Sequence, residues 1–142
     1  MLYCILLIFF ISTTTLNSQQ VVGGWTDQEN LNDPDLIKFS WKAMPQVNAD
    51  ASLANQSNYY LPTQILSAKT QVVAGLNYDM QVLYKGSTCM KNNMRVFEVT
   101  DKNCAPQQSN APGAIFRIRA FSQPWTGTDV VNSVTKIGNA KN

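Results

Sequence analysis

The stretch Gln71-Val72-Val73-Ala74-Gly75 separates two segments of the chain that both have the character of β-strands. The preceding segment covers residues 65–70, and the following one, residues 76–84, alternates apolar with mostly polar side chains. A period of two is typical of a strand that buries one face. Ala74-Gly75 is the predicted point of reversal, because glycine adopts the positive φ that a tight turn requires. The sequence therefore predicts a hairpin with its tip at residues 71–75.

The tip of this hairpin is unusual because it is apolar. Hairpin tips are usually polar, whereas this one carries Val72, Val73 and Ala74 and no charged side chain. One interpretation is an ordinary hairpin. The other is a blunt apolar projection that inserts into the cleft of a partner.

Two further motifs accompany the hairpin. Gly23-Gly24 follows a short apolar N-terminal segment, and Pro124-Trp125 lies near the C-terminus. The central stretch matches the Q-x-V-x-G signature of the cystatins, and the three motifs have the order and approximate spacing of secreted cystatins. The chain thus resembles the cystatin family over essentially the whole of its mature length, and in lacking a cysteine after Cys104 it resembles secreted nematode cystatins.

The resemblance implies a fold and a function. The expected fold is of the α+β class, the cystatin fold, with an antiparallel β-sheet wrapped around one long, kinked α-helix. The expected activity is reversible, tight-binding, non-covalent inhibition of papain-like cysteine proteases of the cathepsin L, S or B type, by a three-part wedge that fills the active-site cleft. The alternative is a non-inhibitory secreted cystatin-like binding module. The residues that the resemblance assigns to protease binding are Val21, Val22, Gly23, Gln71, Val72, Val73, Ala74, Gly75, Pro124 and Trp125.

Composition limits the other functional classes. The 142 residues indicate one domain, and the net charge of +2 comes from scattered basic residues, so nucleic acid is not an expected partner. The chain has no histidine, and glutamate occurs only at positions 29 and 98. The commonest general base and most zinc sites are thereby removed. We expect no enzyme, no catalytic residue, no cofactor and no metal site.

The N-terminus has the layout of a secretory signal. Residues 1–18 are the predicted signal peptide and residues 19–142 the predicted cystatin domain, which makes the protein secreted and extracellular. The apolar block at residues 5–11 falls short of the ~20 residues that a membrane span requires. Cleavage near Ser18 would remove Cys4 and leave Cys89 and Cys104, an even number in an oxidising compartment, as the predicted disulfide.

The remaining elements follow from local patterns. Asp33-Pro34-Asp35 is a helix start, and a helix bent at Pro45 is expected over residues 34–53. Further strands are expected at residues 96–100, 114–120 and 130–134. The predicted apolar stripe of the helix is Leu36, Phe39 or Ser40, Ala43, Val47, Ala51 and Ala54, and the inner face of the strand at 114–120 is Phe116, Ile118 and Ala120.

Two positions leave alternatives open. Asn55-Gln56-Ser57 is an Asn-x-Ser sequon and so a candidate for glycosylation. Some secreted cystatins carry an asparagine at this place that inhibits legumain-type proteases, so Asn55 is either a legumain-binding residue or part of a plain loop. Trp125 is a core residue or, as its tight Pro-Gly loop favours, an exposed interface anchor. The resemblance also implies a monomer that can form a domain-swapped dimer.

Overall fold

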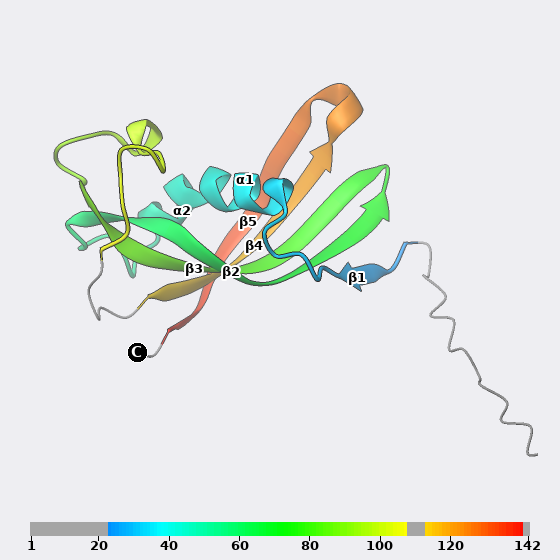
Figure 1. Ribbon diagram of the computed structural model, residues 1–142, viewed down its shortest axis with the longest axis horizontal. Helices are drawn as coiled ribbons and strands as arrows, with labels where there is room; N and C mark the ends of the chain where they lie inside the picture. The colour runs from blue at the N-terminus through cyan, green and yellow to red at the C-terminus, as the bar shows by residue number, and fades with distance from the viewer. Residues whose placement is uncertain (1–22, 108–112, 141–142) are drawn as a thin grey trace, which may run out of the picture.

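The computed structural model describes residues 23–107 and 113–140, and these residues form one antiparallel sheet with a helical layer on one face (Figure 1). The sheet has five strands in the order β1-β2-β3-β4-β5. The predicted α+β class and the sheet wrapped around a kinked helix are confirmed. The elements are β1 (Trp25–Asp27), α1 (Pro34–Lys42), α2 (Met44–Ala49), β2 (Asn58–Val73), β3 (Gly75–Met90), the 3₁₀ turn η1 (Val96–Glu98), β4 (Ala114–Gln123), the 3₁₀ turn η2 (Pro124–Thr126) and β5 (Thr128–Asn139).

The helix begins where the sequence predicts and is divided near Pro45. The Asp33 side chain caps it by accepting a hydrogen bond from the Asp35 N–H at 2.8 Å. Pro45 lies in the first turn of α2, where its missing N–H is tolerated, so the division falls at Ala43. No helix among the described residues is long and apolar enough to cross a lipid bilayer.

The helix ends earlier than predicted. It stops at Ala49 rather than near residue 53, because Asp50 takes an extended conformation and its side chain accepts the Ser52 N–H at 2.9 Å. Ala51 and Ala54, which we expected in the apolar stripe, are therefore exposed.

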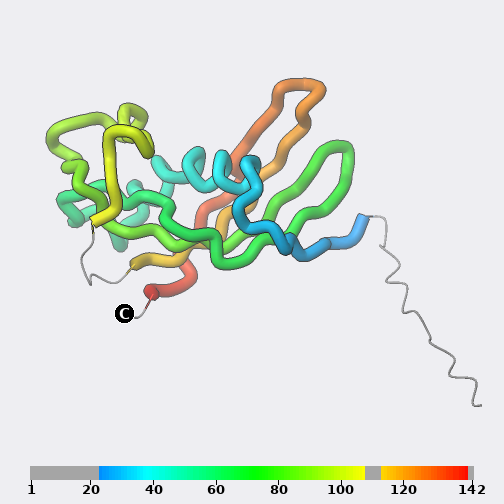
Figure 2. The backbone as a smooth tube through the Cα atoms, in the orientation of Figure 1, coloured from blue at the N-terminus to red at the C-terminus, as the bar shows by residue number. Residues whose placement is uncertain are grey.

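The core lies between the helical layer and the inner face of the sheet, and the tube in Figure 2 shows α1 and α2 crossing that face. The alternation predicted for residues 76–84 is confirmed, since Tyr78, Met80, Val82 and Tyr84 are all buried. The buried Tyr84 hydroxyl donates to the Ser40 carbonyl at 2.6 Å and so links the sheet to α1. The buried side chains from the helical layer and from β4 include Leu36, Phe39, Ala43, Val47, Phe116, Ile118 and Ala120, and the predicted inner face of β4 is confirmed.

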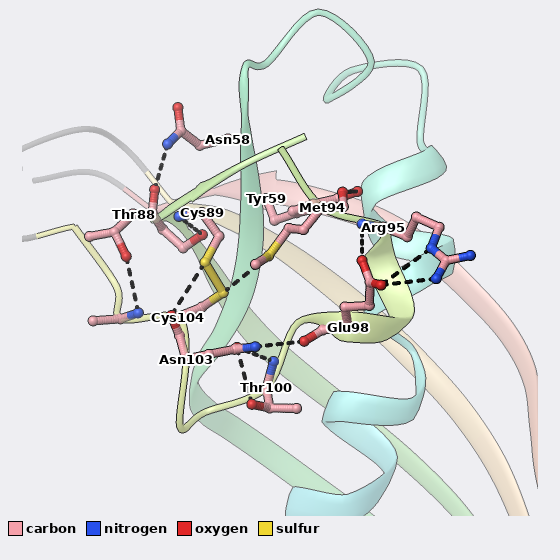
Figure 3. The surroundings of a disulfide bond; sticks show 12 residues. Asn58, Tyr59, Thr88, Cys89, Met94, Arg95, Glu98, Thr100, Asn103 and Cys104 are labelled. Atoms are coloured by element: carbon pink, nitrogen blue, oxygen red, sulfur yellow. Dashed lines mark hydrogen bonds and ion pairs between the residues drawn. A yellow bond between two sulfur atoms is a disulfide. The ribbon is translucent and has the colours of Figure 1, made fainter. Parts of the chain in front are cut away.

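The end of the sheet away from the β2–β3 tip carries the Cys89–Cys104 disulfide, which forms as predicted (Figure 3). The segment it encloses is not the strand that we expected at residues 96–100. Residues 96–98 form the 3₁₀ turn η1, in which the N–H groups of Glu98 and Val99 donate to carbonyls three residues earlier. The Glu98 carboxylate also accepts the Arg95 N–H at 2.7 Å. These donors are satisfied locally, so they do not extend a sheet ladder.

Candidate functional site

Three segments that are far apart in the sequence lie at the same end of the sheet, opposite the disulfide (Figure 1). They are residues 23–25, which enter β1; residues 71–75, at the turn between β2 and β3; and residues 123–127, at the turn between β4 and β5. We call these three segments together the loop edge. It contains every described residue that the sequence assigned to protease binding.

The first turn of the loop edge is as tight as a hairpin allows. The ladder between β2 and β3 extends to the pair Val73–Gly75 and leaves Ala74 as the single turn residue. Gly75 has a φ of +133°, and a Cβ there would lie 2.6 Å from the Ser122 carbonyl oxygen. Glycine is therefore required both by the backbone conformation and by the close approach of β4. Val72, at 64% exposure, presents an apolar side chain from this turn.

The second turn carries the most exposed large apolar side chain of the loop edge. Pro124, Trp125 and Thr126 form η2, and Gly127 closes the turn with a φ of +69° and an N–H donated to the Pro124 carbonyl at 3.1 Å. The Trp125 side chain is 70% exposed. Of the two interpretations of Trp125, the structure supports an exposed side chain and not a core residue.

The N-terminal segment is held against the first turn. Trp25 pairs with Gln71 in the β1–β2 ladder, and Gly23 precedes it with a φ of +86° in open space. Val21 and Val22 lie outside the described residues. Trp25 is 47% exposed and adds an apolar side chain that the sequence analysis did not single out. Its position directly after Gly23-Gly24 is the signal that could have found it.

Side-chain amides connect the three segments. The Gln71 Nε2 donates to the Gly23 carbonyl at 2.8 Å, which joins the N-terminal segment to the first turn. The Gln123 Nε2 donates to the Ala74 carbonyl at 2.9 Å, which joins the second turn to the first. The loop edge is therefore a connected surface and not a set of separate loops.

Beside the second turn, a lysine of α1 is paired with an aspartate of β5 and with one of its own helix. Lys38 of α1 contacts Asp129 of β5 at 2.9 Å and Asp35 at 2.8 Å. The hydrogen bond that Lys38 donates to Asp35, with a further one to Asp129, raises the pKa of Lys38, and the hydrogen bond from Lys38 lowers the pKa of Asp129. The three charges beside the second turn are thus compensated by one another.

Asn55 does not belong to the loop edge. It is exposed in the turn between α2 and β2, close to the pair Asn58–Met90, which lies at the opposite end of the β2–β3 hairpin from Val73–Gly75. The structure thus separates the candidate legumain-binding residue from the candidate protease-binding residues that it describes.

Comparison with known proteins identifies the family. The family model described as "Cystatin domain" matches residues 23–116. The chain belongs to the cystatin family. The matched region includes Gly23 and the first turn of this cystatin but ends before Pro124-Trp125. The family consists of inhibitors rather than enzymes, which supports the expectation that this chain is not an enzyme.

Named relatives support the assignment to this family, and a solved structure supports the fold. Cystatin cpi-1 of Caenorhabditis elegans is 31% identical over 107 residues, which cover 75% of this chain and 72% of the relative. Cystatin cpi-1 of Brugia malayi is 32% identical over 99 residues, or 70% of this chain and 72% of the relative. The salivary cystatin of the soft tick Ornithodoros moubata matches with a TM-score of 0.64 at 20% identity, over 82% of this chain and 98% of that one, and so shares the fold. These two nematode relatives agree with the resemblance to nematode cystatins that the sequence shows.

Proposed function

We propose that this cystatin is a reversible, tight-binding, non-covalent inhibitor of papain-like cysteine proteases of the cathepsin L, S or B type. One observation carries the proposal: three segments that are hydrogen-bonded to one another present exposed apolar side chains along one edge of a rigid sheet. A projecting edge of this kind suits insertion into a concave cleft, whereas a flat surface would not enter one. The domain that acts is residues 19–142, secreted after removal of residues 1–18.

The mechanism is occupation of the cleft on both sides of the catalytic cysteine of the protease. Val21, Val22 and Gly23 would lie along the non-primed subsites, and the two turns would fill the centre and the primed side. Ala74 lies in a turn closed by the pair Val73–Gly75, so it does not offer an extended peptide bond in register for cleavage. Inhibition therefore needs no covalent step.

The driving force is apolar burial. An aromatic side chain buries about 150–250 Å² when fully enclosed. Trp125 is 70% exposed in the free protein. At about 25 cal/mol per Å², its enclosure would contribute about 3–4 kcal/mol before the entropic cost of association. Trp125 is thus the expected anchor of the interface.

The test is a titration of active papain with the full chain produced through a eukaryotic secretory pathway, using a fluorogenic peptide substrate. Stoichiometric loss of activity that reverses on dilution is the expected result. Absence of inhibition by a folded monomer would refute the proposal and favour the non-inhibitory binding module.

Variants locate the inhibitory surface. Trp125→Ala and Gly23→Trp should each weaken inhibition and leave the domain folded. Phe97→Ala is the matched control, because Phe97 is an aromatic of similar exposure, 68%, in the disulfide loop at the other end of the sheet. Equal inhibition constants for Trp125→Ala, Gly23→Trp and the control would contradict the three-part wedge.

A further inference from the structure

The two glutamines of the loop edge have hydrogen bonds at both ends of their amides. Gln71 donates to the Gly23 carbonyl at 2.8 Å, while its Oε1 accepts from the Asn77 Nδ2 at 3.1 Å. Gln123 donates to the Ala74 carbonyl at 2.9 Å, while its Oε1 lies 3.0 Å from the Thr126 hydroxyl. Partners at both ends of an amide favour one rotamer and one donor direction.

The group that contacts each amide oxygen comes from the directly paired strand or from the turn that follows the glutamine. Asn77 is the cross-strand partner of Gln71 in the β2–β3 ladder, so its position is set by the sheet itself. Thr126 lies three residues after Gln123, in η2 beside Trp125, and its hydroxyl is also 2.9 Å from the Gln123 carbonyl. The hydroxyl has one proton and can satisfy only one of these acceptors at a time.

The acceptors of the two amides are the backbone groups that most need an anchor. Ala74 is the one residue between β2 and β3, and Gly23 precedes Trp25, the first paired residue of β1. Gly23 has a φ of +86° and no atom within 4 Å of where a Cβ would lie, so packing does not hold its conformation. The Gln71 side chain supplies the contact that packing does not.

We infer that Asn77 and Gln123 are positioning residues that set the three segments of the loop edge in one docking geometry before the protease binds. Asn77 acts through Gln71 on the N-terminal segment, and Gln123 acts on the Pro124–Thr126 turn and so on Trp125. The inference rests on the proposed function for its effect on inhibition. The order that it imposes on the free protein can be measured separately.

The size of the effect follows from the nature of the bonds. A net hydrogen bond at an exposed site changes an equilibrium by about 2- to 12-fold. Loss of either positioning residue should therefore weaken inhibition by about that factor, because the freed segment must be ordered again when it docks.

Double-variant cycles against papain separate positioning from direct contact. Gln123→Val and Gln123→Glu both remove the donor to Ala74, and Gln123→Glu keeps the shape of the side chain. When Trp125→Ala is also present, each of these Gln123 substitutions should change the inhibition constant by less than twofold. The effect of Asn77→Ala should likewise vanish in a chain that lacks residues 1–24. Gln81→Ala is the matched control, because Gln81 is an exposed amide four residues after Asn77 in β3. This variant should inhibit papain as strongly as the parent chain does.

A second readout does not depend on inhibition. Hydrogen exchange of the free protein should accelerate in the peptide covering residues 23–27 for Asn77→Ala, and around residues 72–76 and 123–128 for Gln123→Val, with the urea midpoint unchanged. Unchanged exchange, or a loss of inhibition that persists in the Trp125→Ala and arm-deleted backgrounds, would overturn the inference. If the parent chain fails to inhibit papain while these exchange rates rise, the proposed function fails and the positioning role stands.

Discussion

Gly75→Ala should destabilise this cystatin far more than Gly127→Ala, although both glycines have positive φ and both lie in turns of the loop edge. Gly127 adopts the left-handed helical conformation, with a φ of +69° and a ψ of +18°, and a Cβ there meets no atom within 4 Å. Alanine at this position bears only the conformational cost of about 1–2 kcal/mol.

Gly75 differs in two respects. Its φ of +133° lies farther from any conformation that alanine adopts, at a cost of about 1–3 kcal/mol. A Cβ would also lie 2.6 Å from the Ser122 carbonyl oxygen and 2.7 Å from the Phe121 ring. The carbonyl is backbone and cannot move without separating β3 from β4, so overpacking adds about 1–3 kcal/mol. The total is about 2–6 kcal/mol, a large share of the ~5–15 kcal/mol that stabilises a typical domain.

Urea unfolding with the disulfide intact measures the difference. The two costs differ by about 2–3 kcal/mol at the middle of their ranges, so with a slope of about 2 kcal/mol per molar urea the midpoint of Gly75→Ala should fall by about 1 M relative to Gly127→Ala. Inhibition of papain should weaken in parallel, because the displaced turn no longer lines up with Gln123. If the two variants unfold at the same urea concentration, the close approach of β4 to the tip does not constrain Gly75, and the reasoning is refuted.

Three further predictions concern other parts of the molecule. Replacing both cysteines of the Cys89–Cys104 disulfide by alanine should lower the free energy of unfolding by about 3 kcal/mol, from its 15-residue separation, and leave the inhibition constant unchanged. The hydrogen bonds from Arg117 hold the pKa of the Asp79 carboxyl below its unfolded value near 3.8, so the stabilisation is present above that pH and is lost as the pH falls through the lower folded pKa. Urea midpoints measured from pH 6 to 2 should therefore fall more steeply for the parent than for Asp79→Asn. The sequon at Asn55 lies in an exposed turn, so the secreted chain should carry a glycan that a peptide N-glycosidase removes and Asn55→Gln abolishes; an unglycosylated product would leave the asparagine free for legumain-type recognition.

The sheet was predictable because its patterns are local. The alternation at residues 76–84 and the apolar face of Phe116, Ile118 and Ala120 each specify a buried side without reference to the rest of the chain. The end of the helix and the segment at 96–100 were not, because side chains there compete for backbone donors. The Asp50 side chain accepts a hydrogen bond from the Ser52 N–H, and the Glu98 side chain accepts one from the Arg95 N–H. Apolar periodicity does not detect such competition.

The loop edge was predictable in its membership but not in its connections. The motifs at 71–75 and 124–125 identified the turns, and their exposure followed from turn chemistry. The contact made by Gln123 depends on the register between β3 and β4, which are far apart in the sequence, and the contact made by Asn77 depends on the register of the β2–β3 hairpin. Trp25 was missed for the same reason, since its exposure depends on pairing with Gln71.

The rigidity of the loop edge has to come from the edge itself, because the core does not reach it. On β3 the buried side chains begin at Tyr78, whose ring lies 5.0 Å from that of Phe39 in α1. Leu76 is only half-buried, and Gly75 is buried by the close approach of β4. Beyond that point the two hairpins extend past the helix (Figure 1), so burial against α1 no longer holds them. What remains is the β3–β4 pairing that continues to Leu76–Ser122, the close approach at Gly75 and the two glutamine amides. An edge built this way leaves its apolar side chains exposed, and its stiffness can be changed by single substitutions that leave the core intact.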